Sequence, residues 1–131
     1  MKFLNNYSPF IGRVLISLIF LMAGMNKIFA YAGTQGYMQA MGVPGALLPF
    51  VIALEVLGAI AIIMGFKTKL FAFLLAGFSV VSAFIFHLDF ADQTQSIMFM
   101  KNMAIAGGFM FLVANGAGKF ALDNKYSNGD K

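Results

Sequence analysis

The sequence predicts an all-α membrane protein in which four transmembrane helices form an up-down-up-down bundle. Of its 131 residues, 60% are hydrophobic and only 11% are charged, whereas about 25% of residues are charged in a typical soluble domain. The hydrophobic residues gather in four runs, each close to the length of roughly 20 residues that a helix needs to cross a bilayer. Short connections between the runs favour antiparallel neighbours, so we expect a single membrane domain over residues 1–131.

The first predicted span covers residues 10–30. Pro9 precedes it, and a proline suits the start of a helix because its missing N–H would have no partner there. Ala30-Tyr31-Ala32 resembles a signal-peptide cleavage site, but Lys27 lies between the apolar run and this site, which is unlike a cleaved leader. We therefore expect the run to be retained as a span.

The second span is predicted at residues 46–65 and is interrupted only by Glu55. Residues 31–45 precede it, carry no charge and are rich in glycine. They read as a connecting loop with a short interfacial helix around residues 37–41. Residues 65–69 follow as a tight polar turn.

The third and fourth spans are predicted at residues 70–87 and 97–115. A short acidic loop, residues 88–96, connects them. The sequence Asn115-Gly-Ala-Gly118 is a strong helix stop, after which residues 119–131 form a polar tail.

The distribution of basic residues predicts the orientation of the bundle. Cytoplasmic loops of membrane proteins carry an excess of Lys and Arg. One side of the predicted topology collects seven of these residues: Lys2, Arg13, Lys67, Lys69, Lys119, Lys125 and Lys131. We therefore expect a multi-pass membrane protein with both termini in the cytoplasm and residues 31–45 and 88–96 outside.

Composition excludes several classes of function. The chain has no cysteine and one histidine, so it cannot hold an iron–sulfur cluster, a zinc–thiolate site or a haem with two histidine ligands. It has no dinucleotide-binding fingerprint. No basic run is interleaved with aromatic residues, so nucleic-acid binding has no support, and we expect neither a metal site nor a cofactor built into the chain.

Five polar residues lie within or at the ends of the predicted spans and are the candidate ligand-binding residues. They are Lys27, Glu55, His87, Lys101 and Asn102. At about 100° per residue, the charged positions fall on helix faces that also hold small residues, which mark close helix approaches in membranes. Glu55 lies near the middle of its span, and the others lie in the outer part of theirs. We expect an outward-facing pocket in which Lys27, His87 and Lys101 surround Glu55.

Each of these residues also has a structural interpretation. Lys27 and Lys101 are equally consistent with side chains that extend to the membrane surface. Glu55 is too deep for that, so a structural salt bridge competes with a proton-transfer or ligand role. A solvated or structural role is favoured for His87. Arg13 is interpreted as an anchor at the cytoplasmic membrane edge.

Motifs in the order of the chain resemble the DoxX family. They are Arg13 at the start of the first span, Ala23-Gly24-x-x-Lys27 at its end, Glu55-x-x-Gly58 and Gly65 in the second span, and Lys101-Asn102 followed by Gly107-Gly108 in the fourth. The similarity covers about residues 10–116. It implies a small four-helix inner-membrane protein of a family whose members are described as subunits or partners of membrane oxidoreductases, including quinone-linked ones. The family's recurring polar positions are carried here by Arg13, Lys27, Glu55, Lys101 and Asn102.

Three functions remain open at this stage. The first is a non-autonomous subunit of a quinone-linked oxidoreductase, because Lys27, His87, Lys101 and Asn102 are donors for a quinone carbonyl and Glu55 or His87 is a candidate proton relay. The second is a non-enzymatic assembly or docking subunit. The third, less favoured, is a small-molecule transporter, for which four spans are few. The lipid bilayer is the expected partner for all three functions. A partner oxidoreductase and assembly as a homo-oligomer both remain possible.

Overall fold

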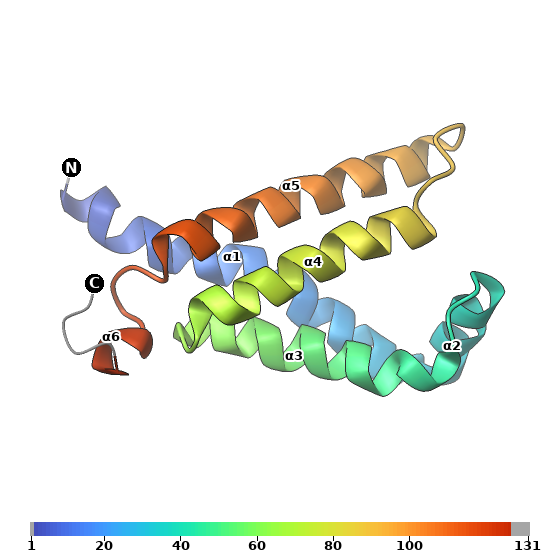
Figure 1. The fold of residues 1–131 in the computed structure, drawn as a ribbon, viewed down its shortest axis with the longest axis horizontal. Helices are drawn as coiled ribbons and strands as arrows, with labels where there is room; N and C mark the ends of the chain where they lie inside the picture. Colours follow the sequence, from blue (N-terminus) through green and yellow to red (C-terminus); the bar gives the residue numbers. More distant parts are fainter. Residues whose placement is uncertain (1, 127–131) are drawn as a thin grey trace.

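The computed structural model describes residues 2–126 and is built from helices, with no strand in that part of the chain. Figure 1 shows their arrangement. The helices are α1 (Lys2–Phe29), α2 (Tyr31–Ala40), the 3-10 helix η1 (Gly45–Leu47), α3 (Leu48–Met64), α4 (Thr68–Phe86), α5 (Gln93–Asn115) and α6 (Asp123–Tyr126). Of these, α1, η1 with α3, α4 and α5 are long and apolar enough to cross a membrane. The all-α, four-span prediction is confirmed.

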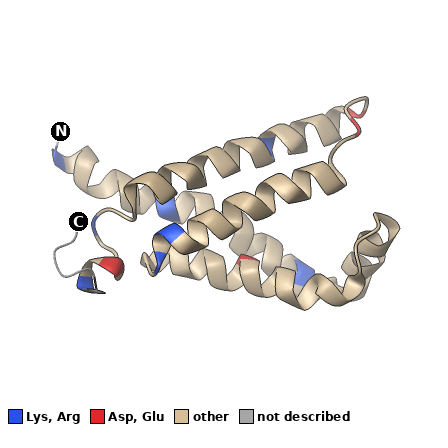
Figure 2. Ribbon diagram, viewed as in Figure 1, with Lys and Arg blue, Asp and Glu red and all other residues tan. Residues whose placement is uncertain are grey.

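The four long helices pack as two pairs, α1 with α3 and α4 with α5, which are joined mainly by contacts between α3 and α4. The start of α1, the α3–α4 turn and α6 lie at one end of the bundle, which we call the terminal end (Figure 1). The helix α2 and the α4–α5 loop lie at the other end, the loop end. Figure 2 shows Lys and Arg gathered at the terminal end and long uncharged stretches between the two ends.

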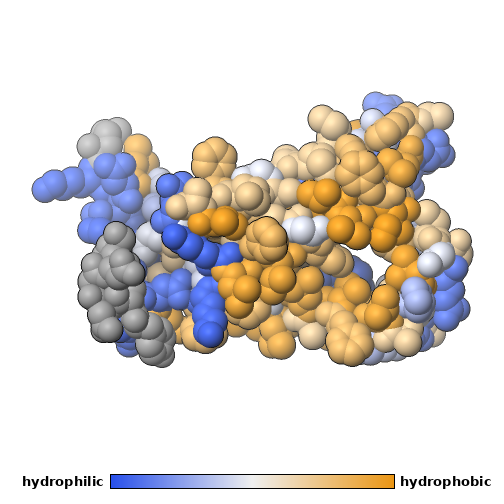
Figure 3. Space-filling view, in the orientation of Figure 1, coloured by the Kyte–Doolittle hydropathy of each residue, from blue (hydrophilic) through white to orange (hydrophobic). Residues whose placement is uncertain are grey.

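Apolar side chains form a core at the centre of the bundle. Phe20 of α1 and Phe109 of α5 pack with ring centroids 5.6 Å apart, and Ile62 and Leu75 are fully buried beside them. Gly58 brings α3 so close to α4 that an added Cβ would lie 3.3 Å from Leu75, as expected where small residues let membrane helices approach. The outer surface remains largely hydrophobic (Figure 3), as a lipid-facing surface requires.

Helix α1 begins earlier than the sequence suggested. The predicted start at Pro9 is wrong, because the helix begins at Lys2 and contains Pro9. Two contacts hold the extra turns against the rest of the chain: the rings of Tyr7 and Phe120 stack 5.3 Å apart, and Gly118 lies against Pro9. Packing thus offsets the missing N–H and the backbone clash that a proline brings to a helix interior.

The connections also differ in detail from the predicted loops. Residues 31–45 hold a ten-residue helix, α2, instead of a loop with a short helix. Helix α5 begins at Gln93, four residues before the predicted start, because Asp92 caps it by accepting a hydrogen bond from the Thr94 backbone N–H at 2.9 Å. An aspartate is a favoured N-cap because its carboxylate satisfies an otherwise unpaired N–H of the first turn.

The interpretation of Arg13 as an interfacial anchor is corrected by the structure. Its side chain is completely buried, and its two terminal guanidinium nitrogens donate four hydrogen bonds to backbone carbonyls. The acceptors are Ile62, Ile63, Lys119 and Phe120, at 2.9–3.1 Å. Carbonyls in the last turn of a helix and in irregular chain need such partners, so Arg13 ties α1 to the end of α3 and to the segment after α5.

The predicted tight turn after α3 is confirmed and is fastened by the chain after α5. Gly65 ends α3 with φ of 71°, a left-handed conformation that favours glycine. The Asp123 carboxylate accepts hydrogen bonds from the backbone N–H groups of Lys67 and Thr68 at 2.6 and 2.9 Å, which satisfies the start of α4. Within the predicted tail, residues 119–126 are thus held against the bundle, and Lys131 lies outside the described residues.

Replacing Arg13 with leucine is expected to destabilise the bundle by about 3 kcal/mol or more, because four carbonyls lose a charged donor. Arg13→Lys should cost less but not be neutral, since an ammonium lacks the planar fork of a guanidinium. Unfolding of the purified protein in mixed micelles, followed by circular dichroism, measures both. Lys2→Leu removes a charge from an exposed site on the same helix and is the control; an equal loss in Lys2→Leu and Arg13→Leu contradicts this role of Arg13.

Candidate functional site

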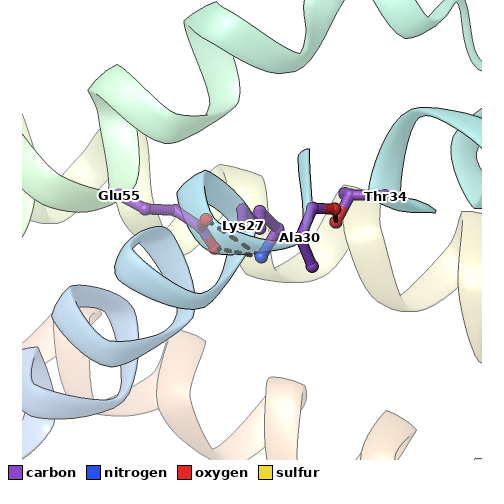
Figure 4. A network of polar contacts seen from close by, with 4 residues as sticks. All are labelled: Lys27, Ala30, Thr34 and Glu55. Atoms are coloured by element: carbon purple, nitrogen blue, oxygen red, sulfur yellow. Dashed lines mark hydrogen bonds and ion pairs between the residues drawn. The ribbon is translucent and has the colours of Figure 1, made fainter. Parts of the chain in front are cut away.

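Lys27 and Glu55 form an ion pair inside the bundle. Lys27 stands in the last turn of α1 and Glu55 in the middle of α3. The Lys27 Nζ lies 3.0 Å from Glu55 Oε1 and 3.2 Å from Oε2, and it donates a hydrogen bond to Oε2. Figure 4 shows the two side chains reaching toward each other from neighbouring helices. The prediction that Lys27 or Lys101 meets Glu55 is thus resolved in favour of Lys27.

Close packing of α1 and α3 brings the two charges together. Gly24 lies one turn before Lys27, and a Cβ placed on it would stand 2.5 Å from Val56 and 3.4 Å from the Glu55 Cβ. Any larger residue at position 24 would push α3 away from α1. The small residue beside Lys27 therefore sets the helix separation that the ion pair needs.

The two members of the pair differ in their access to the surroundings. The side chain of Glu55 is 4% exposed and that of Lys27 is 28% exposed. A charge at this depth costs several kcal/mol unless it is paired, and a cation near a helix C-terminus also interacts favourably with the helix dipole. Lys27 is therefore the member that reaches the surface, and Glu55 depends on it.

The other three candidate residues lie on the α4–α5 side of the molecule. His87 follows the last residue of α4, and its Nδ1 lies 3.0 Å from Gln95 Oε1. The Asn102 side-chain amide donates to the Ser79 carbonyl at 3.2 Å, which ties α5 to α4. Lys101 is exposed on α5. Among residues 2–126, the only carboxylate within 4.0 Å of a lysine ammonium is Glu55, next to Lys27.

The expected arrangement of His87 and Lys101 around Glu55 is therefore not what the structure has. Helical periodicity predicts which residues share a face of one helix, but it does not say which neighbouring helix that face meets. Asn102 and Lys101 are adjacent in sequence and point about 100° apart, so Asn102 bonds to α4 whereas Lys101 is exposed. The roles of Gln95 and Ser79 were missed, because a carbonyl acceptor such as that of Ser79 leaves no signal in the sequence.

The arrangement offers a small set of polar groups in an apolar setting. A lysine ammonium has three N–H groups, and the carboxylate engages Lys27 at two oxygens. Glu55 Oε1 is within ion-pair distance yet accepts no hydrogen bond within residues 2–126. A hydrogen-bond acceptor beside the Lys27 ammonium and a hydrogen-bond donor beside Glu55 Oε1 would satisfy the remaining polar groups of the pair.

The comparisons with known proteins agree with the fold. The family model described as DoxX matches residues 8–88. Inner membrane protein YqjF of Escherichia coli is 48% identical over 123 residues, which covers 94% of this chain and 95% of the relative. Inner membrane protein YphA of the same organism is 36% identical over 123 residues, covering 88% and 87%. An uncharacterized protein of Haemophilus influenzae is 30% identical over 135 residues, covering 96% and 98%. No solved structure matches the chain significantly.

The Lys27–Glu55 pair predicts an asymmetric pattern of stability. Lys27→Met is expected to destabilise the bundle by about 3 kcal/mol, because it leaves a buried, unpaired carboxylate. Glu55→Leu should cost less, since Lys27 is partly exposed and its stem lets the ammonium reach water. The double variant Lys27→Met/Glu55→Leu should cost less than the sum of its single substitutions, with a coupling of about 1 kcal/mol or more. A double-mutant cycle in mixed micelles measures the coupling, and additive losses would contradict the pairing.

Proposed function

The chain belongs to the DoxX family, with inner-membrane proteins among its relatives, and from this premise we propose that it is a non-autonomous subunit or partner of a quinone-linked membrane oxidoreductase. It is a multi-pass protein of the inner membrane. We further propose that the terminal end faces the cytoplasm. The gathering of Lys and Arg at that end (Figure 2) supports this orientation.

The observation that carries the proposal is the Lys27–Glu55 pair. A lipid-soluble quinone needs a hydrogen-bond donor for its carbonyl in an apolar site, and the partly exposed Lys27 retains an N–H beyond its two contacts with Glu55. When bound, a quinone supplies two-electron redox chemistry. The residues of this chain would hold its headgroup: Lys27 donates to the carbonyl, and Glu55 holds Lys27 in place.

The surroundings of the pair suit an apolar ligand. Figure 3 shows the surface hollowed between the loop ends of α4 and α5 and those of α2 and α3, with hydrophobic side chains around the hollow. In the same half of the molecule the rings of Tyr37 and Phe86 stack 5.3 Å apart, between α2 and α4. Lys27 also belongs to this half, since it lies in the last turn of α1. These features support a site that a ligand enters from the membrane.

The proposal assigns electron transfer to a partner protein. The chain has no cysteine and a single histidine, so its side chains supply neither a dithiol nor paired haem ligands. His87, Lys101 and Asn102 are not needed for the headgroup in this arrangement. The exposed Lys101 on α5 is instead a candidate contact for the partner.

An assembly or docking subunit without any ligand is the second candidate. It is favoured by one observation: Lys27 and Glu55 already satisfy much of each other's need for partners. In that case the pair serves only to hold α1 against α3, as buried polar groups do in other helix bundles.

A thermal-shift titration with short-chain ubiquinone and menaquinone analogues separates the two candidates. The wild-type protein in detergent is expected to gain several degrees in Tm, because the ligand binds the folded state. Lys27→Met/Glu55→Leu should lose most of this gain, whereas Lys101→Met keeps it. A wild-type protein that gains nothing from either quinone supports the docking subunit and overturns the quinone site.

A tag fused after Lys131 tests the partner and the orientation together. Pull-down from gently solubilised native membranes is expected to enrich a flavin- or metal-containing oxidoreductase, and a protease should reach the tag in inside-out vesicles but not in spheroplasts. Mass spectrometry identifies the captured proteins, with an unrelated four-span protein carrying the same tag as the control. Capture of no oxidoreductase contradicts the subunit proposal, and cleavage in spheroplasts contradicts the orientation.

A further inference from the structure

Two adjoining hollows lie at the terminal end, far from the Lys27–Glu55 pair. The first, which we call the headgroup pocket, has a volume of about 710 Å³ and is lined by Lys67, Thr68, Lys69, Lys119, Asp123 and Asn124, among others. The second, which we call the chain groove, has a volume of about 500 Å³, and Gly12, Arg13, Ile16, Gly108, Phe111 and Leu112 line it. The two share Pro9, Asn115, Gly116 and Gly118, so they are neighbours along the bundle axis.

The headgroup pocket is cationic. It has three lysines and one acid, and the Asp123 carboxylate is engaged by the backbone N–H groups of Lys67 and Thr68. Within residues 2–126, no carboxylate oxygen lies within 4.0 Å of the ammonium groups of Lys67, Lys69 or Lys119. Such a pocket at the edge of a membrane bundle matches the phosphate of a lipid headgroup, because basic pockets between transmembrane helices bind anionic lipids.

Two buried polar groups at these hollows have no partner within the described part of the chain. They are the hydroxyl of Thr68, which lines the headgroup pocket, and Nε of Arg13, which lines the chain groove. Both residues are completely buried. Unsatisfied buried groups are rare in native proteins and need an explanation. A phosphate oxygen or an ester carbonyl of a glycerolipid would accept a hydrogen bond from each.

The chain groove has a largely apolar lining, whereas most of the residues that line the headgroup pocket are polar. It runs between α1 and α5, and Ile16, Phe111 and Leu112 form its walls. Gly12 opens it further, since no atom lies within 4 Å of where its Cβ would be. A polar pocket that continues into an apolar groove has the layout of a phospholipid, with a charged head and a hydrocarbon chain.

We propose that the terminal end binds one anionic phospholipid, with its phosphate in the headgroup pocket and one acyl chain in the chain groove. Lys67, Lys69 and Lys119 neutralise the phosphate, and Thr68 donates to it. Both volumes lie within the roughly 300–1,000 Å³ of typical ligand sites. The lipid would fill the space between α1 and α5 and so join the two helix pairs at this end.

The test uses delipidated full-length protein in detergent and native mass spectrometry, with titrations of phosphatidylglycerol, phosphatidylcholine and inorganic phosphate. Phosphatidylglycerol is expected to bind with a stoichiometry of one and at least about tenfold more tightly than phosphatidylcholine. The variant Lys69→Gln/Lys119→Gln should weaken phosphatidylglycerol binding about 25-fold, at about fivefold per lysine. Lys2→Gln/Lys125→Gln removes the same charge outside the pocket and should leave binding unchanged.

A glycine variant tests the acyl chain separately. Gly12→Phe adds a ring beside the chain groove, at a position where an added Cβ meets no atom within 4 Å, and is expected to weaken phosphatidylglycerol binding at least about tenfold. Gly77→Phe, at another open helical glycine outside both hollows, is the matched control. The proposed site is wrong if phosphatidylglycerol and phosphatidylcholine bind equally tightly. It is also wrong if both double lysine variants lose the same amount of phosphatidylglycerol affinity. If inorganic phosphate binds as tightly as phosphatidylglycerol and Gly12→Phe has no effect, the phospholipid proposal is wrong and the ligand is a free anion.

Discussion

The structure depends on one constraint: charges and free carbonyls inside the bundle need polar partners, because the hydrocarbon of the bilayer offers none. Arg13 meets this constraint at the terminal end by donating to four carbonyls from two separate segments. Lys27 meets it toward the loop end by pairing with Glu55. Both residues belong to α1 and both bind α3 or its end. Polar contacts therefore fix α1 against α3 at two depths.

The second helix pair is attached in a different way. Asn102 joins α5 to α4 through the Ser79 carbonyl, but α4 meets α3, and α5 meets α1, through apolar packing around Leu75 and Phe109. In a membrane such packing is not driven by the hydrophobic effect and depends on close fit. The molecule thus consists of two helix pairs, each with a polar contact inside it, that are joined to each other mainly by close apolar packing. The proposed quinone and lipid sites both lie where these two pairs separate.

The sequence was sufficient for the four spans, because hydropathy is a local property, but it left Lys27 and Lys101 both open as the partner of Glu55. The sequence was insufficient for the contacts of Arg13, because its four acceptors are backbone carbonyls, and every residue type has such a carbonyl. It was misleading for Pro9, since packing of Tyr7 and Gly118 overrides a local helix signal. Lys101 and Asn102 show the remaining limit: adjacent residues on one helix meet different surroundings, and only the arrangement of neighbouring helices decides which.

The contacts of Arg13 also bear on how the protein is made. Arg13 leaves the ribosome before two of its acceptors, Lys119 and Phe120, which lie 106 and 107 residues later in the chain. The bonds from Leu122 and Asp123 to Met64 and Gly65 have the same long separation. The terminal end therefore closes only after residues 119–123 have been synthesised. Until then Arg13 lacks two of its four acceptors, so this segment completes the assembly of the terminal end.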